Sequence, residues 1–168
     1  MYKIGDKVIY GAMGVVEIVD IRSESIGTDL RSYYVLKETG CASSSETLIP
    51  TDSKPLVDRM RPLLSGEELI ALIREAKKLP PIEWIKDNRA RADKYKRILQ
   101  EGDRLELIRM ISSIDEAGKR RIEEGKKNYL ADEGAMKKAE YLLYSEVSEV
   151  MGIPYASVPG FIENILQN

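Results

Sequence analysis

The fold of the first part of the chain is decided by residues 4–21, IGDKVIYGAMGVVEIVDI. Two short runs of β-branched and aromatic residues, 7–10 and 14–21, stand on either side of a turn that contains Gly11 and Gly14. Runs of this kind, separated by glycine turns, are typical of paired β-strands. The stretch therefore predicts an N-terminal β-hairpin.

More strands are expected directly after this hairpin. Residues 32–37 and 47–49 are also short and apolar, and Gly27 marks the turn between the second and third strands. Closely spaced short strands of this kind favour a small, strongly bent barrel over an open sheet. Residues 1–53 are therefore predicted to form a β-barrel of the SH3 or Tudor type.

After Pro55 the apolar residues recur with the period of an α-helix. Ser65-Gly66-Glu67-Glu68 has the form of a capping box, and the helix that it starts should end at Pro80-Pro81. Residues 119–128 are mostly charged and fit either a helix or a connection. Further helices are expected from about 82–84 to Gln100, from Asp103 onward, along 136–150, and after Pro159.

The predicted fold class is therefore α+β with two domains. A small SH3/Tudor-like β-barrel occupies residues 1–53, a linker follows at 54–64, and a compact all-α domain covers residues 65–168. At 168 residues, with 43% hydrophobic and 32% charged side chains, the chain is long enough to give each domain a modest core.

The composition also narrows the classes of function. The chain has no histidine, and its single cysteine, Cys41, excludes an internal disulfide. Histidine is the usual general base, the usual activator of a nucleophile and a frequent zinc ligand. We therefore expect no enzyme, no catalytic residues, no metal and no cofactor. Neither a signal peptide nor a membrane-spanning run is visible, so a cytoplasmic protein is expected.

Positive charge gathers around the only tryptophan, Trp84. Residues 77–97 hold eight basic and three acidic side chains, so this stretch carries +5 in a chain whose total is −2. A flat apolar ring beside such charges favours nucleic-acid binding, because bases offer a face for stacking. By composition alone, burial of Trp84 in a core is the commoner outcome.

Several motifs recur in a fixed order along the chain. They are residues 4–11, 14–16, 33–36 and 48–50, then Arg61-Pro62-Leu63, Trp84 and residues 100–103. Together they resemble the CarD/CdnL family of bacterial transcription regulators. The opening module also occurs in transcription-repair coupling factors, but this chain is far too short for the helicase motor of such a factor.

The resemblance implies that the β-barrel docks on the β subunit of RNA polymerase. In this family the barrel adds a strand edge to a polymerase sheet, a contact that relies on backbone hydrogen bonds. The contact residues implied here are Leu48, Ile49 and Pro50.

The resemblance also implies that the helical domain binds promoter DNA at the upstream edge of the transcription bubble. Trp84 would wedge into the minor groove, while Lys86, Arg89 and Arg91 would hold the flanking phosphates. Asp87 stands where relatives often carry a basic residue. The function implied is stabilisation of the promoter open complex by a monomeric factor.

Two other functions stay open at this point. Small barrels with a Gly-Val-Val-x-Ile strand also occur in translation proteins, so an RNA-binding or ribosome-associated module is an alternative. A hydrolase that uses a carboxylate pair has only the abundance of acidic residues, 28 in all, in its favour.

Overall fold

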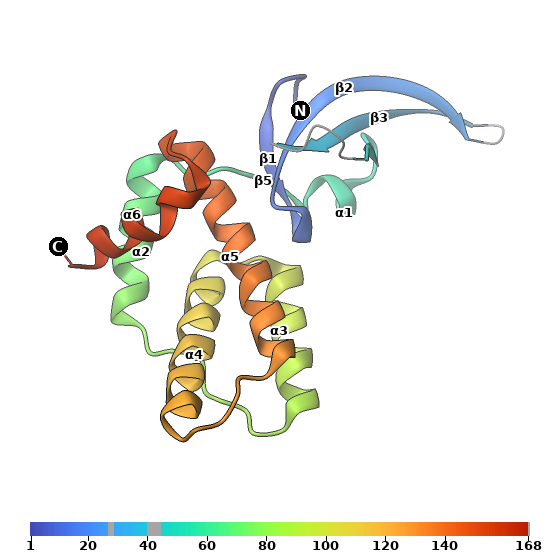
Figure 1. The fold of residues 1–168 in the computed structure, drawn as a ribbon. Coiled ribbons are helices and arrows are strands. Elements are labelled where there is room, and N and C mark those ends of the chain that lie inside the picture. Colours follow the sequence, from blue (N-terminus) through green and yellow to red (C-terminus); the bar gives the residue numbers. More distant parts are fainter. Residues whose placement is uncertain (27–28, 40–44, 168) are drawn as a thin grey trace. The chain divides into compact units, whose positions relative to one another are not determined.

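The computed structural model describes residues 1–26, 29–39 and 45–167, which form two compact units (Figure 1). The first unit is Met1–Leu63 and the second is Leu64–Asn168. Gly27 and Cys41 lie outside the described residues. An antiparallel sheet comes first in the chain and the helices follow, so the predicted α+β class is confirmed, whereas closure of the strands into an SH3/Tudor-like barrel stays a prediction.

The first unit is built on a five-stranded antiparallel sheet with the strand order β4-β3-β2-β1-β5. Gly11 and Gly14 take up φ angles of +51° and +74° in the turn after the first strand, where a side chain would be strained. The strands are β1 (Lys7–Tyr10), β2 (Val15–Ile26), β3 (Asp29–Glu38), β4 (Thr47–Pro50) and β5 (Met60–Pro62).

Strands β2 and β3 form a long curved pair (Figure 1). Their register shifts between Ile18 and Asp20, which marks a β-bulge, and a bulge bends a strand and increases its twist. Alternate residues of the sheet face one hydrophobic core, as the pleat requires. Its buried members are Val8, Tyr10, Val16, Ile18, Tyr34, Leu36, Ile49 and Met60.

Residues 54–64, which we expected to be a linker, contain two elements of the first unit. The short helix α1 (Lys54–Val57) follows β4, and β5 then pairs with β1, so that Tyr10 faces Met60. Met60 is buried in the sheet core. A three-residue strand that ends in proline is too short to show a strand pattern in the sequence.

The second unit contains five α-helices among its described residues. The capping box that opens the first of them is present, because Ser65 Oγ accepts from Glu68 N–H at 3.2 Å and Glu68 Oε2 accepts from Ser65 N–H at 2.8 Å. The helices are α2 (Gly66–Lys78), α3 (Asn88–Glu101), α4 (Arg104–Glu123), α5 (Leu130–Met151) and α6 (Val158–Gln167).

The starts of helices α3 and α5 differ from those expected. Helix α3 begins at Asn88 rather than near 82–84, because the Asp87 carboxylate caps it by accepting from Ala90 N–H at 2.7 Å. Trp84 therefore lies in the connection between α2 and α3 and not in a helix. Helix α4 includes the first part of the charged stretch and ends at Glu123, and α5 begins at Leu130 rather than near 136.

A buried ion pair fixes the start of the second unit. The Glu146 carboxylate, 2% exposed, accepts from Arg104 Nε and Nη2 at 2.7 Å each and from Leu64 N–H at 3.0 Å. One side chain of α5 thus holds both α4 and the first residue of this unit. No helix among the described residues has the length and apolar character needed to cross a membrane.

Candidate functional site

The connection that carries Trp84 is fastened to α4 on the side that precedes the tryptophan. Arg109 Nε donates to the Pro80 carbonyl at 2.9 Å, and Ser113 Oγ donates to the Ile82 carbonyl at the same distance. Ile82 itself is buried in the core of the helical unit. Trp84, two residues later, is only partly buried.

Arg91, expected at the phosphates, is instead one of the most deeply buried charged residues of the unit, at 2% exposure. Its Nε donates to both carboxylate oxygens of Asp132, at 3.1 and 3.2 Å, and Nη2 lies 3.0 Å from Oδ2 of the same carboxylate. Nη1 donates to the Ile85 carbonyl at 2.8 Å and Nη2 to Asn88 Oδ1 at 2.9 Å. The prediction of a phosphate contact by Arg91 is wrong, because its donors are already used inside the protein.

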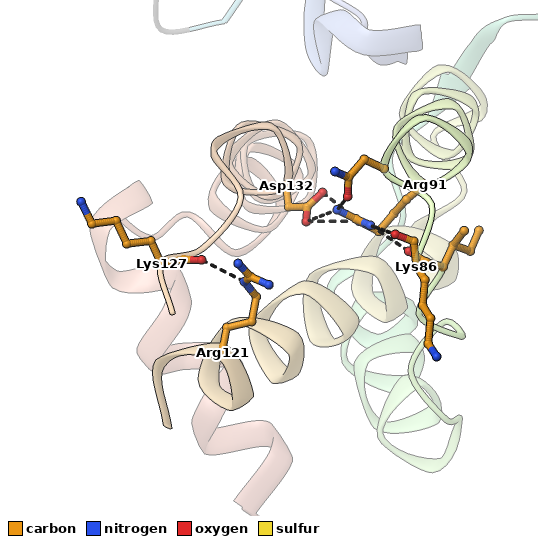
Figure 2. A network of polar contacts seen from close by, with 7 residues as sticks. Lys86, Arg91, Arg121, Lys127 and Asp132 are labelled. Carbon is orange, nitrogen blue, oxygen red and sulfur yellow. Dashed lines mark hydrogen bonds and ion pairs between the residues drawn. The ribbon is translucent and has the colours of Figure 1, made fainter. Parts of the chain in front are cut away.

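The same guanidinium stacks against two aromatic rings. Its Cζ lies 4.3 Å from the centre of the Trp84 ring and 4.8 Å from that of Tyr129. Arg121 Cζ lies 3.9 Å from the centre of the Tyr129 ring, and Arg121 Nε donates to the Lys127 carbonyl at 2.9 Å. Figure 2 shows Arg91 between Asp132 and the backbone at Lys86. Cation–π contacts thus connect Trp84 to α4 and to the start of α5.

A basic hollow borders Trp84. We use this name for the depression lined by Trp84, Lys86, Ala117, Arg120, Arg121, Glu124, Lys126 and Tyr129. It contains four basic side chains and one acidic one, and three of the basic residues, Lys86, Arg120 and Lys126, are exposed. Lys126 Nζ lies 2.6 Å from Glu124 Oε2. This surface offers positive charge to a phosphate backbone right beside the indole.

No pattern in the sequence indicates that Arg120, Arg121 and Lys126 lie near Trp84. They lie more than 30 positions along the chain from it, in the stretch for which helix and connection were both open. They lie near Trp84 because the connection that carries it is fastened to α4 by Arg109 and Ser113. Of the predicted phosphate ligands, Lys86 lines the basic hollow, whereas Arg89 is exposed on the first turn of α3 and lines neither of the hollows at Trp84.

A second hollow shares Trp84, Arg121 and Tyr129 with the first but is acidic on balance. Its apolar floor includes Ile114 and Met136, and Glu140 is among its acidic residues. Burial raises the pKa of Glu140 above its ordinary value, while Lys137 lowers it. Among the described residues no Asp, Glu or Cys side chains are grouped closely enough to hold a metal ion.

The third feature is strand β4, which forms an edge of the sheet in the first unit. Ile49 is 3% exposed and belongs to the core, whereas its neighbours Leu48 and Pro50 are half-buried. Thr51 N–H donates to the Ser32 carbonyl of β3 at 2.9 Å. Because backbone groups alternate in direction along an antiparallel strand, Leu48 N–H and C=O point away from β3.

Comparison with known proteins concerns this first unit. Residues 2–63 match the family described as the CarD-like/TRCF RID domain, and these are nearly the same residues as the unit itself. The first unit is a CarD-like domain. The family comprises RNA polymerase-interacting transcription factors, and its domain is a non-enzymatic interaction module. No match was found among curated proteins.

The edge of the CarD-like domain brings only two of its three predicted contact residues to the surface. Leu48 and Pro50 keep part of their side chains exposed, but Ile49 faces Tyr34 across the sheet and packs in the core. A direct side-chain contact of Ile49 with a partner is therefore ruled out by its burial. Its part in the CarD-like domain is to hold β4 on the sheet.

Proposed function

We propose that this protein binds the β subunit of RNA polymerase through its CarD-like domain and stabilises the promoter open complex through its helical unit. The observation that carries the proposal is the partly exposed Trp84 at the border of the basic hollow, in a chain whose first unit is a polymerase-interacting domain. The family match favours polymerase over the ribosome as the partner.

Trp84 would act as a wedge at the junction of duplex and melted DNA. Insertion of an apolar ring between base steps requires unstacking, which is largely complete where the strands have already separated. The contact therefore favours the open state over intact duplex. A preference of about 1.4 kcal/mol is enough to shift the equilibrium tenfold, so strong binding to free DNA is not needed.

The phosphates on either side of the wedge would be held by exposed basic residues. Lys86, Arg120 and Lys126 surround the indole in the basic hollow, and Arg89 adds a charge on α3. Contacts of this type orient a protein on DNA without reading its sequence. A factor that acts at many promoters needs this kind of binding.

Docking would use the outer edge of β4. Leu48 directs its backbone donor and acceptor away from the sheet, and a strand of the polymerase can continue the sheet at that edge. The half-buried side chains of Leu48 and Pro50 would then contribute selectivity. Pro50 has no N–H, and its carbonyl accepts from Ser53 N–H at 3.1 Å, which limits the pairing at that end of β4.

The test compares two promoters that differ only in whether the bubble is already melted. With purified polymerase, the protein should raise the yield of open complex on the fully paired promoter and much less on a promoter with a mismatched bubble. An equal effect on both templates would contradict a role in favouring the open state. Retention of the protein on ribosomal RNA and not on polymerase would support the alternative function.

A further inference from the structure

Arg91 joins the connection that carries Trp84 to the start of α5. Its Nη1 donates to the carbonyl of Ile85, the residue next to Trp84, at 2.8 Å, and its Nε and Nη2 pair with Asp132 on α5. At the same time its Cζ lies 4.3 Å from the centre of the Trp84 ring. One planar group therefore holds the backbone beside Trp84 and also stacks on its ring.

We propose that Arg91 is a positioning residue that sets the orientation of the Trp84 indole, with Asp132 as its fixed counter-ion. This inference rests on the proposed role of Trp84 at the bubble edge. It replaces the direct phosphate contact that the sequence suggested for Arg91, and it gives Asp132 a part in DNA binding although Asp132 is 5% exposed and carries negative charge.

The chemistry of the guanidinium explains why arginine suits this position. Its donors lie in the plane of the group, so it can donate to Asp132 and to the backbone while its flat face stacks on an aromatic ring. A lysine ammonium is compact and cannot serve all of these partners at once. Arg91→Lys therefore keeps the charge but loses the geometry.

Tyr129 connects Arg91 to α4 through its ring. Its ring centre lies 4.8 Å from Arg91 Cζ and 3.9 Å from Arg121 Cζ. Arg121 comes from α4, and Tyr129 precedes the first residue of α5. Trp84 is thus held by side chains from helical parts of the unit, although it lies in a connection itself.

A wedge benefits from being oriented before it meets DNA. A side chain that must be immobilised on binding loses part of the free energy of the contact, so a preformed orientation strengthens it. Release of the indole should therefore shorten the open-complex lifetime by about twofold to tenfold. The basic hollow would keep its phosphate contacts.

Trp84 is the only tryptophan, so fluorescence excited at wavelengths that the nine tyrosines do not absorb reports on this position alone. Arg91→Lys is compared with Arg97→Lys, the same substitution at an exposed position of the same helix. Arg91→Lys should raise the constant for acrylamide quenching by about 1.5-fold or more, because one ring face loses its stacked group. It should also shorten the open-complex lifetime while polymerase binding persists. Arg97→Lys should change neither.

Unchanged quenching in a folded Arg91→Lys protein would overturn the positioning role. If that variant does not fold, Asn88→Ala removes the acceptor of one Nη2 bond from the helix surface, and Tyr129→Leu removes the second ring. Both should raise quenching in the same direction, and no change in either would equally overturn the proposal.

The fluorescence experiment needs neither polymerase nor DNA, which separates this inference from the proposed function. Increased quenching in Arg91→Lys, together with unchanged lifetimes in both Arg91→Lys and Trp84→Ala, would support the positioning of the indole and overturn the open-complex function. A shortened lifetime in Trp84→Ala alone, without any effect of Arg91→Lys on quenching or lifetime, would support the open-complex function and overturn the positioning role of Arg91.

Discussion

Asp132 on α5 receives the guanidinium of Arg91 from α3, with Arg91 Nη2 and Asp132 Oδ2 3.0 Å apart and both side chains more than nine-tenths buried. A buried charge that loses its partner is strongly destabilising, whatever the net contribution of the intact pair. Replacement of either residue should therefore destabilise the fold around Trp84.

Asp132→Asn should lower the free energy of unfolding of the helical unit by about 3 kcal/mol, because Arg91 keeps its charge in a buried site. Urea unfolding followed by Trp84 fluorescence measures this loss. The matched control is Asp115→Asn, which breaks an exposed pair with Lys119 on α4 and should leave the midpoint unchanged. Equal midpoints for Asp132→Asn and the wild type would show that the pair is not needed.

Leu48→Glu should abolish binding to polymerase without unfolding the CarD-like domain, because the side chain is half-buried at the edge strand. Leu30→Glu, the same substitution at a residue 73% exposed elsewhere in the sheet, should bind normally. Binding is measured by co-purification with polymerase. Retention of Leu48→Glu on polymerase would exclude the outer edge of β4 as the contact.

Lys126→Ala should weaken the binding of the protein to a forked promoter fragment and reduce the dependence of that binding on salt. Loss of one phosphate contact lowers the slope of log K against log salt concentration by about 1. Lys96→Ala, at an exposed position of α3 that lines neither hollow, is the control and should keep the wild-type slope. An unaltered slope for Lys126→Ala would remove the basic hollow from the DNA path.

Glu140→Gln should stabilise the helical unit slightly at neutral pH. Burial raises the pKa of Glu140 in the folded state, so the folded protein binds the proton more tightly than the unfolded chain does. The ionised form therefore disfavours folding above the folded pKa, and this penalty disappears as the pH falls below the unfolded value of about 4.3. Because the side chain is partly exposed, the gain should stay below about 0.5 kcal/mol at pH 7 and vanish near pH 4. Urea midpoints at the two pH values measure it, and a gain that persists at pH 4 would contradict this explanation.

Patterns local in the sequence predicted the strand at 7–10, a strand at 47–49 that in the structure extends to Pro50, and the capped start of α2. In each case the pattern lies in neighbouring residues, such as the glycines of the turn after β1. Ser65 and Glu68 likewise form a capping-box pattern, and they exchange the hydrogen bonds that this pattern predicts. Asp87 is of a residue type that commonly caps helices, but the helix was expected to start near 82–84. Trp84 was consequently placed in a helix that starts four residues later.

The surroundings of Trp84 could not be predicted from the sequence, because they depend on contacts between residues that are far apart in the chain. Arg91 looks like any other cation of a basic stretch until Asp132, 41 positions away, is packed against it. The same holds for Arg120 and Lys126, which the packing of α4 brings to the indole. Of the basic residues at 77–97, only Lys86 lines the basic hollow, and Arg91, to which the family resemblance assigned a phosphate contact, is buried.

The most direct test of the account is the lifetime of the promoter open complex at saturating protein, with wild-type and Trp84→Ala chains that bind polymerase equally well. The wild type should lengthen the lifetime, and Trp84→Ala should lose most of that gain, by about tenfold for a contact of 1.4 kcal/mol. A folded, polymerase-bound Trp84→Ala protein that gives the wild-type lifetime would contradict the role of Trp84 as a sensor of opened DNA.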